Sequence, residues 1–194
     1  MTEQFIALHQ LKVRGFATAE AVATGTGLTA DAAAMVLRGL ETDGLVKYRE
    51  GRITGFSLTA DGRSRHAELR DAALAPHQRD AIDAAYHAFL QPNRDFKQLT
   101  TDWQTRPEGE DAAPLLARLN DLHGEVGDVL AAAAEGDPRF QHYLPRFAAA
   151  LSRLRDGDGS AFARPMSDSY HDVWMELHED LLSTLGHERT EADE

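Results

Sequence analysis

Residues 16–63 read FATAEAVATGTGLTADAAAMVLRGLETDGLVKYREGRITGFSLTADGR. Threonine is a frequent first cap of a helix, and glycine frequently ends one. Thr18 is therefore expected to cap a short helix that ends in a glycine turn at 25–27. Thr29 is expected to cap a second helix, which runs to about Asp43.

Working outward, two strand-like segments follow at 45–49 and 53–58, joined by a hairpin tip at 50–52. Thr59 is placed to cap a helix that runs to about residue 75. Before the quoted stretch, apolar residues at helical intervals predict an amphipathic helix over 3–14. This order of helices and hairpin is what a winged helix-turn-helix needs to place one helix in the DNA major groove.

Three motifs carry a family resemblance. VATGTGLT at 22–29 resembles the Leu-Ala-x-x-x-Gly-Leu-Ser turn of MarR-like and PadR-like regulators. LETDGLV at 40–46 is similar to the family's Leu-Glu-x-x-Gly-Leu-Val, and LTADGR at 58–63 is similar to its Leu-Thr-x-x-Gly-Arg. The resemblance covers roughly residues 1–73. It implies a bacterial transcriptional regulator that binds pseudo-palindromic operator DNA as a homodimer.

The resemblance also implies which residues meet DNA. Ala33, Val36, Leu37 and Leu40 form the expected inner stripe of the second capped helix, so its other face is turned outward. That face offers few groups that bond base edges, so phosphate anchoring and shape reading are expected to dominate. The expected DNA contacts are Thr29, Asp31, Ala32, Met35, Arg38, Lys47, Arg49, Arg52, Arg63 and Arg65.

Charge leaves a second interpretation open. Residues 1–73 hold nine Lys and Arg and nine Asp and Glu, so the rest of the chain carries the whole net charge of −12. An acidic body repels a polyanion, so any DNA-binding surface must lie in the N-terminal part. The near-zero charge there, and Asp31 on the outer face, also suit a winged-helix interaction module that does not bind DNA.

The remainder of the chain is predicted to be all helical. The expected helices cover about 77–90, 93–104, 111–134, 138–155 and 167–185, with a glycine-rich loop at 156–160. The fold class is therefore mainly α: a winged helix-turn-helix domain over 1–75, a helical dimerisation domain over 76–186, and a charged tail over 187–194. Dimerisation is expected because helix-turn-helix proteins normally bind two half-sites.

An aromatic and histidine group in the helical domain is a candidate effector site, although aromatic residues at helical spacing also suit a core. The candidates are Phe89, Trp103, Tyr143, His171, Trp174 and His178. His171 and His178 are seven residues apart, or about 10 Å along a helix, so they could share a metal ion only through long side-chain reach or with donors from other helices. No metal site is therefore expected, even with His123 as a further donor.

Composition excludes several other classes. The chain has no cysteine, which rules out disulfides, thiolate metal sites and cysteine nucleophiles. No secretory signal, membrane span, phosphate loop or nucleophile elbow is present, so we expect a cytoplasmic protein that is not an enzyme and carries no cofactor.

Overall fold

The computed structural model describes residues 2–51, 54–107 and 109–187. The protein is mainly helical (76%), with a two-stranded antiparallel sheet. It divides into two compact units, Met1–Ala75 (the N-terminal unit) and Pro76–Glu194 (the C-terminal unit).

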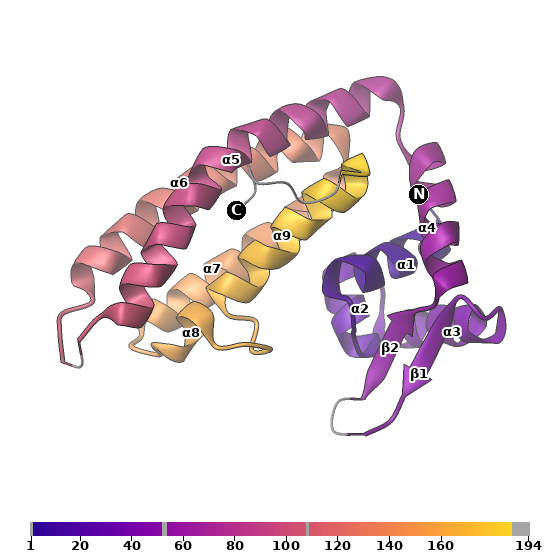
Figure 1. The fold of residues 1–194 in the computed structure, drawn as a ribbon, viewed down its shortest axis with the longest axis horizontal. Coiled ribbons are helices and arrows are strands. Elements are labelled where there is room, and N and C mark those ends of the chain that lie inside the picture. The colour runs from indigo at the N-terminus through magenta and orange to yellow at the C-terminus, as the bar shows by residue number, and fades with distance from the viewer. Residues whose placement is uncertain (1, 52–53, 108, 188–194) are drawn as a thin grey trace. The chain divides into compact units, whose positions relative to one another are not determined.

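The N-terminal unit consists of four helices and a hairpin (Figure 1). In chain order these are α1 (Glu3–Arg14), α2 (Ala19–Thr26), α3 (Ala30–Thr42), β1 (Val46–Arg49), β2 (Gly55–Leu58) and α4 (Ala60–Ala73). Helix α1 has the expected bounds. Both strands begin one or two residues later than expected, and Ile53 lies outside the described residues.

Threonine side chains start the helices of this unit. The hydroxyls of Thr18, Thr29 and Thr59 accept hydrogen bonds from backbone N–H groups three residues later, at 3.2, 3.2 and 3.0 Å. Gly27 ends α2 in the left-handed conformation, with φ of 74°. The expected turn at 25–27 was wrong at Gly25, which lies inside α2. An added Cβ there would overlap the side chain of Gln10, so the glycine permits close packing of α1 against α2.

The core of the N-terminal unit consists of apolar side chains from α1, α2, α3 and the hairpin. Val46 pairs with Leu58 and Tyr48 with Phe56 across the hairpin. Ala17, between α1 and α2, forms an isolated antiparallel bridge with Phe56, through N···O contacts of 3.0 and 2.8 Å. The bridge adds a short third partner to the sheet and fixes the start of α2 beside β2.

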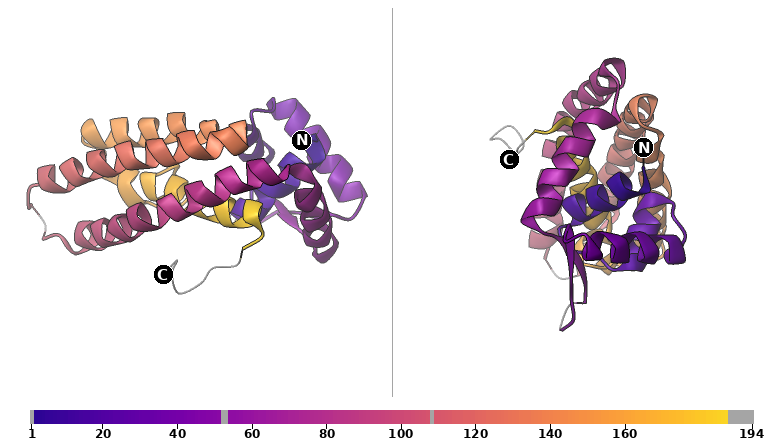
Figure 2. Two further views of the ribbon diagram at one scale, coloured as in Figure 1. Left: turned by 90° about the horizontal axis from the view of Figure 1, so that it is seen from above. Right: turned by 90° about the vertical axis from the view of Figure 1, so that its right-hand side faces the viewer.

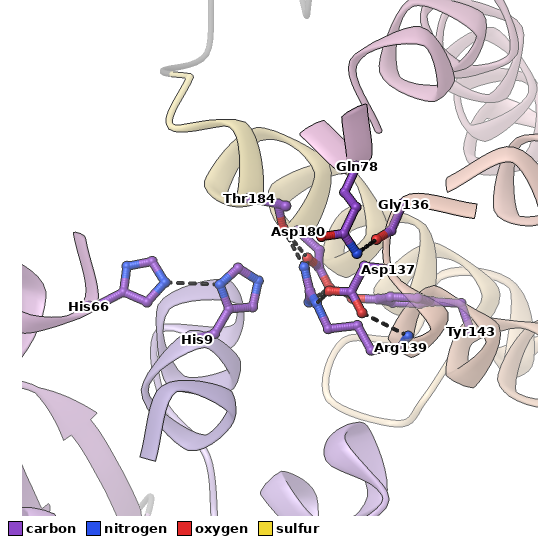
Figure 3. A network of polar contacts seen from close by, with 9 residues as sticks. All are labelled: His9, His66, Gln78, Gly136, Asp137, Arg139, Tyr143, Asp180 and Thr184. Carbon is purple, nitrogen blue, oxygen red and sulfur yellow. Dashed lines mark hydrogen bonds and ion pairs between the residues drawn. The ribbon is translucent and has the colours of Figure 1, made fainter. Parts of the chain in front are cut away.

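Two buried histidines join α1 to α4. His9 Nδ1 and His66 Nε2 lie 2.9 Å apart, and the two rings point toward one another (Figure 3). Phe5 stacks on His66 with ring centroids 5.7 Å apart. Because a ring nitrogen must donate to the other across such a contact, the pair holds one proton between these two atoms.

The C-terminal unit is a bundle of long helices. Helices α5 (Pro76–Thr105) and α6 (Ala113–Gly136) run side by side (Figures 1 and 2). A 3-10 turn, η1 (Pro138–His142), leads into α7 (Tyr143–Arg155), and the short α8 (Ser160–Ala163) precedes α9 (Tyr170–Leu185). Ser169 and Asp172 form a capping box at the start of α9.

Two helix predictions in this unit were wrong. The segments 77–90 and 93–104 are one continuous helix, α5, with Pro92 inside it. Conversely, 138–155 is split into η1 and α7, because Pro145 has no N–H to continue the helical bonding from Gln141. The expected loop at 156–160 also ends earlier, since Ser160 begins α8.

Packing explains why α5 survives its proline. Phe89 and Phe96, on either side of Pro92, both contact Trp174 of α9, with centroids 5.2 and 4.2 Å apart. The Trp174 indole N–H donates to Asn93 Oδ1 at 3.0 Å. These contacts recruit residues before and after Pro92 to one buried face, so packing offsets the hydrogen bond that proline removes.

A buried charged network closes one end of the bundle (Figure 3). Arg139 of η1 donates to Asp137 at 2.5 Å and to Asp180 of α9 at 2.8 Å, and it also bonds Thr184. The Tyr143 hydroxyl donates to Asp180 at 2.8 Å. Burial beside Asp180 raises the pKa of the Tyr143 hydroxyl well above its usual value. The network therefore ties η1 and α7 to α9.

Candidate nucleic-acid interface

Helix α3 turns a polar and partly apolar face outward. Ala33, Leu37 and Leu40 are buried, whereas Asp31, Arg38 and Met35 are exposed, with Met35 66% exposed. Two further expected contacts lie at the start of this helix: Thr29 is exposed and Ala32 is half-buried. Thr29 is the helix cap, and Asp31 lies in the first turn, where a carboxylate stabilises the helix dipole.

Strand β1 separates its side chains by alternation. Val46 is buried and pairs with Leu58, so Lys47 and Arg49 point to the opposite face of the hairpin, where they lie opposite Ser57 and Gly55. Both are exposed. Arg52, the expected contact at the hairpin tip, lies outside the described residues.

The two residues of α4 that were expected to contact DNA, Arg63 and Arg65, have partners within the N-terminal unit. The Arg63 guanidinium donates to Leu58 O at 3.3 Å, and Arg65 pairs with Glu68 at 3.0 Å. Each would have to exchange or share that partner to reach a phosphate.

The two units differ in how they use their cations. Arg38, Lys47 and Arg49 make no side-chain hydrogen bond or ion pair with any described residue. In the C-terminal unit, four arginines are paired with carboxylates: Arg118 with Asp102, Arg139 with Asp137 and Asp180, Arg146 with Asp168 and Glu176, and Arg153 with Asp158. Three cations without a carboxylate partner among the described residues thus lie on α3 and β1.

Two features of this region were not predicted from the sequence. Glu41, in the last turn of α3, accepts a hydrogen bond from the Tyr48 N–H at 3.1 Å, which ties α3 to β1. Tyr48 leaves its ring 41% exposed. The sequence shows an aromatic residue between Lys47 and Arg49, so Tyr48 could have been added to the expected contacts. The Ala17–Phe56 bridge was also not predicted, and no local sequence signal indicates it.

The candidate effector residues are largely packed together. Phe89, Trp174, Tyr143 and His178 are buried, and Phe89 contacts both Trp174 and His178. A ligand among these buried side chains would have to displace neighbouring rings, and the effector site stays a prediction. Trp103 is half-buried, stacks on Phe162 at 4.4 Å, and lies under the Arg106 guanidinium at 4.8 Å.

The histidines near α9 have neighbours of their own. His123 Nδ1 lies 3.2 Å from the Tyr170 hydroxyl, and His171 contacts the Phe96 ring. Burial lowers the pKa of His123, with a further contribution from Arg155. Burial also lowers the pKa of His171, while Asp172 opposes the change. Within the described ranges, no three His, Asp or Glu side chains gather in a way that could hold a metal ion.

In the part of the chain that the structure describes, no helix has the length and apolarity needed to cross a bilayer. No protein-family model, curated protein or solved structure matches this chain.

Proposed function

We propose that the N-terminal unit is a winged helix-turn-helix and that the chain is a bacterial transcriptional regulator that binds operator DNA as a homodimer. Support comes from the element order, in which α2, a left-handed Gly27 turn, α3 and the β1–β2 hairpin follow one another. The Ala17–Phe56 bridge adds to this support, because it holds the hairpin to the segment that begins α2.

The observation that carries the proposal is the set of unpaired cations on α3 and β1. A cation already paired with a carboxylate must break that pair to neutralise a phosphate, whereas Arg38, Lys47 and Arg49 have no such pair with any residue that the structure describes. The strongly acidic remainder of the chain makes such a local surface necessary for DNA binding.

In this proposal α3 enters the major groove and the hairpin lies along the backbone. Ala32 and Met35 offer apolar contact to thymine methyl groups, and Arg38 is the one long cationic side chain on the α3 face. Direct reading of bases is therefore modest, and phosphate contacts supply most of the affinity.

The C-terminal unit is proposed to hold two copies at the spacing of two half-sites, because one winged domain buries too little surface for tight binding alone. A dimer on a promoter would block transcription by occlusion. An effector among the C-terminal helices would change the separation of the two α3 helices.

The experiment compares the full chain with a triple variant, R38Q/K47Q/R49Q. Fluorescence anisotropy against genomic promoter fragments is measured at two salt concentrations. Each lost phosphate contact lowers the slope of log affinity against log salt by about 1, so the variant is expected to lose a slope of roughly 2 to 3.

The matched control is R94Q/R155Q/R164Q, which removes three exposed arginines from the C-terminal unit. It changes net charge equally and is expected to keep the slope of the parent. If both triple variants bind duplex as firmly as the parent, the DNA-binding surface is not on α3 and β1. A parent chain that ignores duplex, or binds it without salt dependence, supports the interaction-module alternative, which the acidic Asp31 on the α3 face favours.

A further inference from the structure

The N-terminal unit contains a groove of about 560 Å³ between α2, α3 and the hairpin. It is lined by the start of α2, one side of α3 and the inner face of the hairpin: Thr18, Ala19, Glu20, Ala34, Arg38, Glu41, Tyr48, Thr54, Gly55 and Phe56. Its volume lies within the range of small-molecule sites, and its lining mixes apolar walls with a few polar groups, as such sites do.

One wall of the groove is aromatic. Tyr48 and Phe56 pair across the hairpin with ring centroids 4.9 Å apart, and Phe56 is buried beneath. Tyr48 remains 41% exposed. The small side chains of Ala19 and Ala34 also line the groove. A flat apolar ligand would cover the exposed ring.

The charges of the lining favour a cation. Glu20 and Glu41 face one arginine, Arg38, so the groove carries one net negative charge. Hydrogen bonds from its own backbone N–H and from the Thr18 hydroxyl lower the pKa of Glu20. Glu41 commits Oε1 to the Tyr48 N–H at 3.1 Å, so the carboxylate is held at the aromatic wall with its second oxygen available.

We propose that this groove binds a small organic cation with a flat aromatic body, placed over Tyr48 with its charged group at Glu41 and Glu20. An amidinium or protonated amine has the required donors, and a cation beside an aromatic face gains further attraction. The same groove carries Arg38, so a bound cation would compete with DNA. That competition rests on the proposed function, whereas ligand binding does not.

The first experiment uses the full chain without DNA. The probe is 2-naphthamidinium, and its neutral analogue 2-naphthamide has nearly the same shape. Titration followed by amide chemical shifts is expected to locate the cation at residues 18–20, 48 and 54–56, with the neutral analogue bound at least about 10-fold more weakly. Equal affinity for the two probes, no binding at millimolar concentration, or shifts confined to other residues would overturn the proposal.

Variants test the carboxylates. Glu41→Gln keeps an oxygen acceptor for the Tyr48 N–H but removes the charge, and it is expected to weaken the cation about 5-fold without affecting the neutral probe. Glu20→Gln, at an exposed position, repeats the test if the first variant is unstable. Glu3→Gln removes the same charge from α1, outside the groove, and is expected to have no effect. Unchanged affinity in both groove variants would refute the assignment.

The second experiment adds a bound promoter fragment. The cation is expected to release DNA from the parent chain, and to need about 5-fold more probe to release it from Glu41→Gln. Release that is equal in the two proteins would reject competition at this groove. If the parent chain binds no duplex at all, the proposed function fails, while the titration without DNA still decides the ligand site.

Discussion

Gly62 shows how one residue of a sequence motif sets the packing of the N-terminal unit. An added Cβ at this buried position would overlap the carbonyl oxygen of Leu45. Thr59, which caps the same helix, donates its hydroxyl to Gly44 O at 2.8 Å. The glycine therefore lets α4 start directly against the turn that follows α3, which gives the glycine of LTADGR at 58–63 a steric role.

Gly62→Ala is expected to lower the free energy of unfolding by about 2 to 3 kcal/mol, because backbone must move to admit the methyl group. Urea unfolding of the full chain measures the change. Gly39→Ala is the control, since that exposed position in α3 has nothing within 4 Å of an added Cβ. The control is expected to raise stability by about 0.5 to 1 kcal/mol. Two losses of similar size would contradict the steric explanation.

The second prediction for a single residue concerns the contribution of the Asp180 carboxylate to stability. Asp180 is buried and accepts from both Arg139 and Tyr143, so Asp180→Ala leaves Arg139 with one carboxylate and Tyr143 without its acceptor. The expected loss in free energy of unfolding is about 3 kcal/mol. Asp102→Ala removes the partly exposed partner of Arg118 and is expected to cost clearly less, because solvent screens that pair. Equal losses would show that burial does not set the value of these pairs.

At the scale of elements, the sequence predicted best where local chemistry decides the structure. The threonine caps, the Gly27 turn and the hairpin were readable because each depends on a few neighbouring residues. The continuity of helix α5 could not be predicted. Pro92 is a local signal for a helix break, but contacts with Trp174, 82 positions further along the chain, override that signal.

The candidate interface, too, was predicted from the sequence only in part. Helical periodicity placed Asp31, Met35 and Arg38 on the outer side of α3, as the structure does. It could not show that Arg65 is paired with Glu68, or that Tyr48 and Glu41 meet, because these contacts depend on side-chain directions and on the register of the hairpin.

The His9–His66 contact provides a prediction about how two elements are coupled. Both single variants to alanine, and the double variant, are compared by urea unfolding in a double-mutant cycle. A buried hydrogen bond between α1 and α4 is expected to give a coupling energy of about 1 kcal/mol. The cycle separates this pair from the other contacts of each ring. A coupling energy near zero would mean that the two imidazoles stabilise their helices independently.

At the scale of the whole molecule, the two units use charge differently. The N-terminal unit has three cations on α3 and β1 without a carboxylate partner among the described residues, whereas the C-terminal unit pairs four of its arginines with carboxylates and carries a surplus of acid. Under the proposed function, this arrangement would direct a polyanion to one part of the chain and away from the remainder. Local charge therefore matters more for the proposed function than the net value of −12.

The half-buried histidines of the C-terminal unit predict how stability depends on pH. Burial lowers the pKa of His123 and of His171 in the folded protein, whereas in the unfolded chain both return to about 6.5. The unfolded chain then binds more protons just below that pH, so the free energy of unfolding should fall as pH drops below about 6.5 and stay level above it.

The double variant H123Q/H171Q is expected to flatten this fall between pH 7 and pH 5, when urea unfolding of the full chain is measured at each pH. Its absolute stability will differ, because His123 loses its contact with the Tyr170 hydroxyl, so the slope and not the height is the readout. His77→Gln, which removes an exposed histidine of α5, serves as the control and should leave the slope as in the parent. Curves for the double variant and the parent that run parallel through this range would show that neither imidazole is kept neutral by the fold.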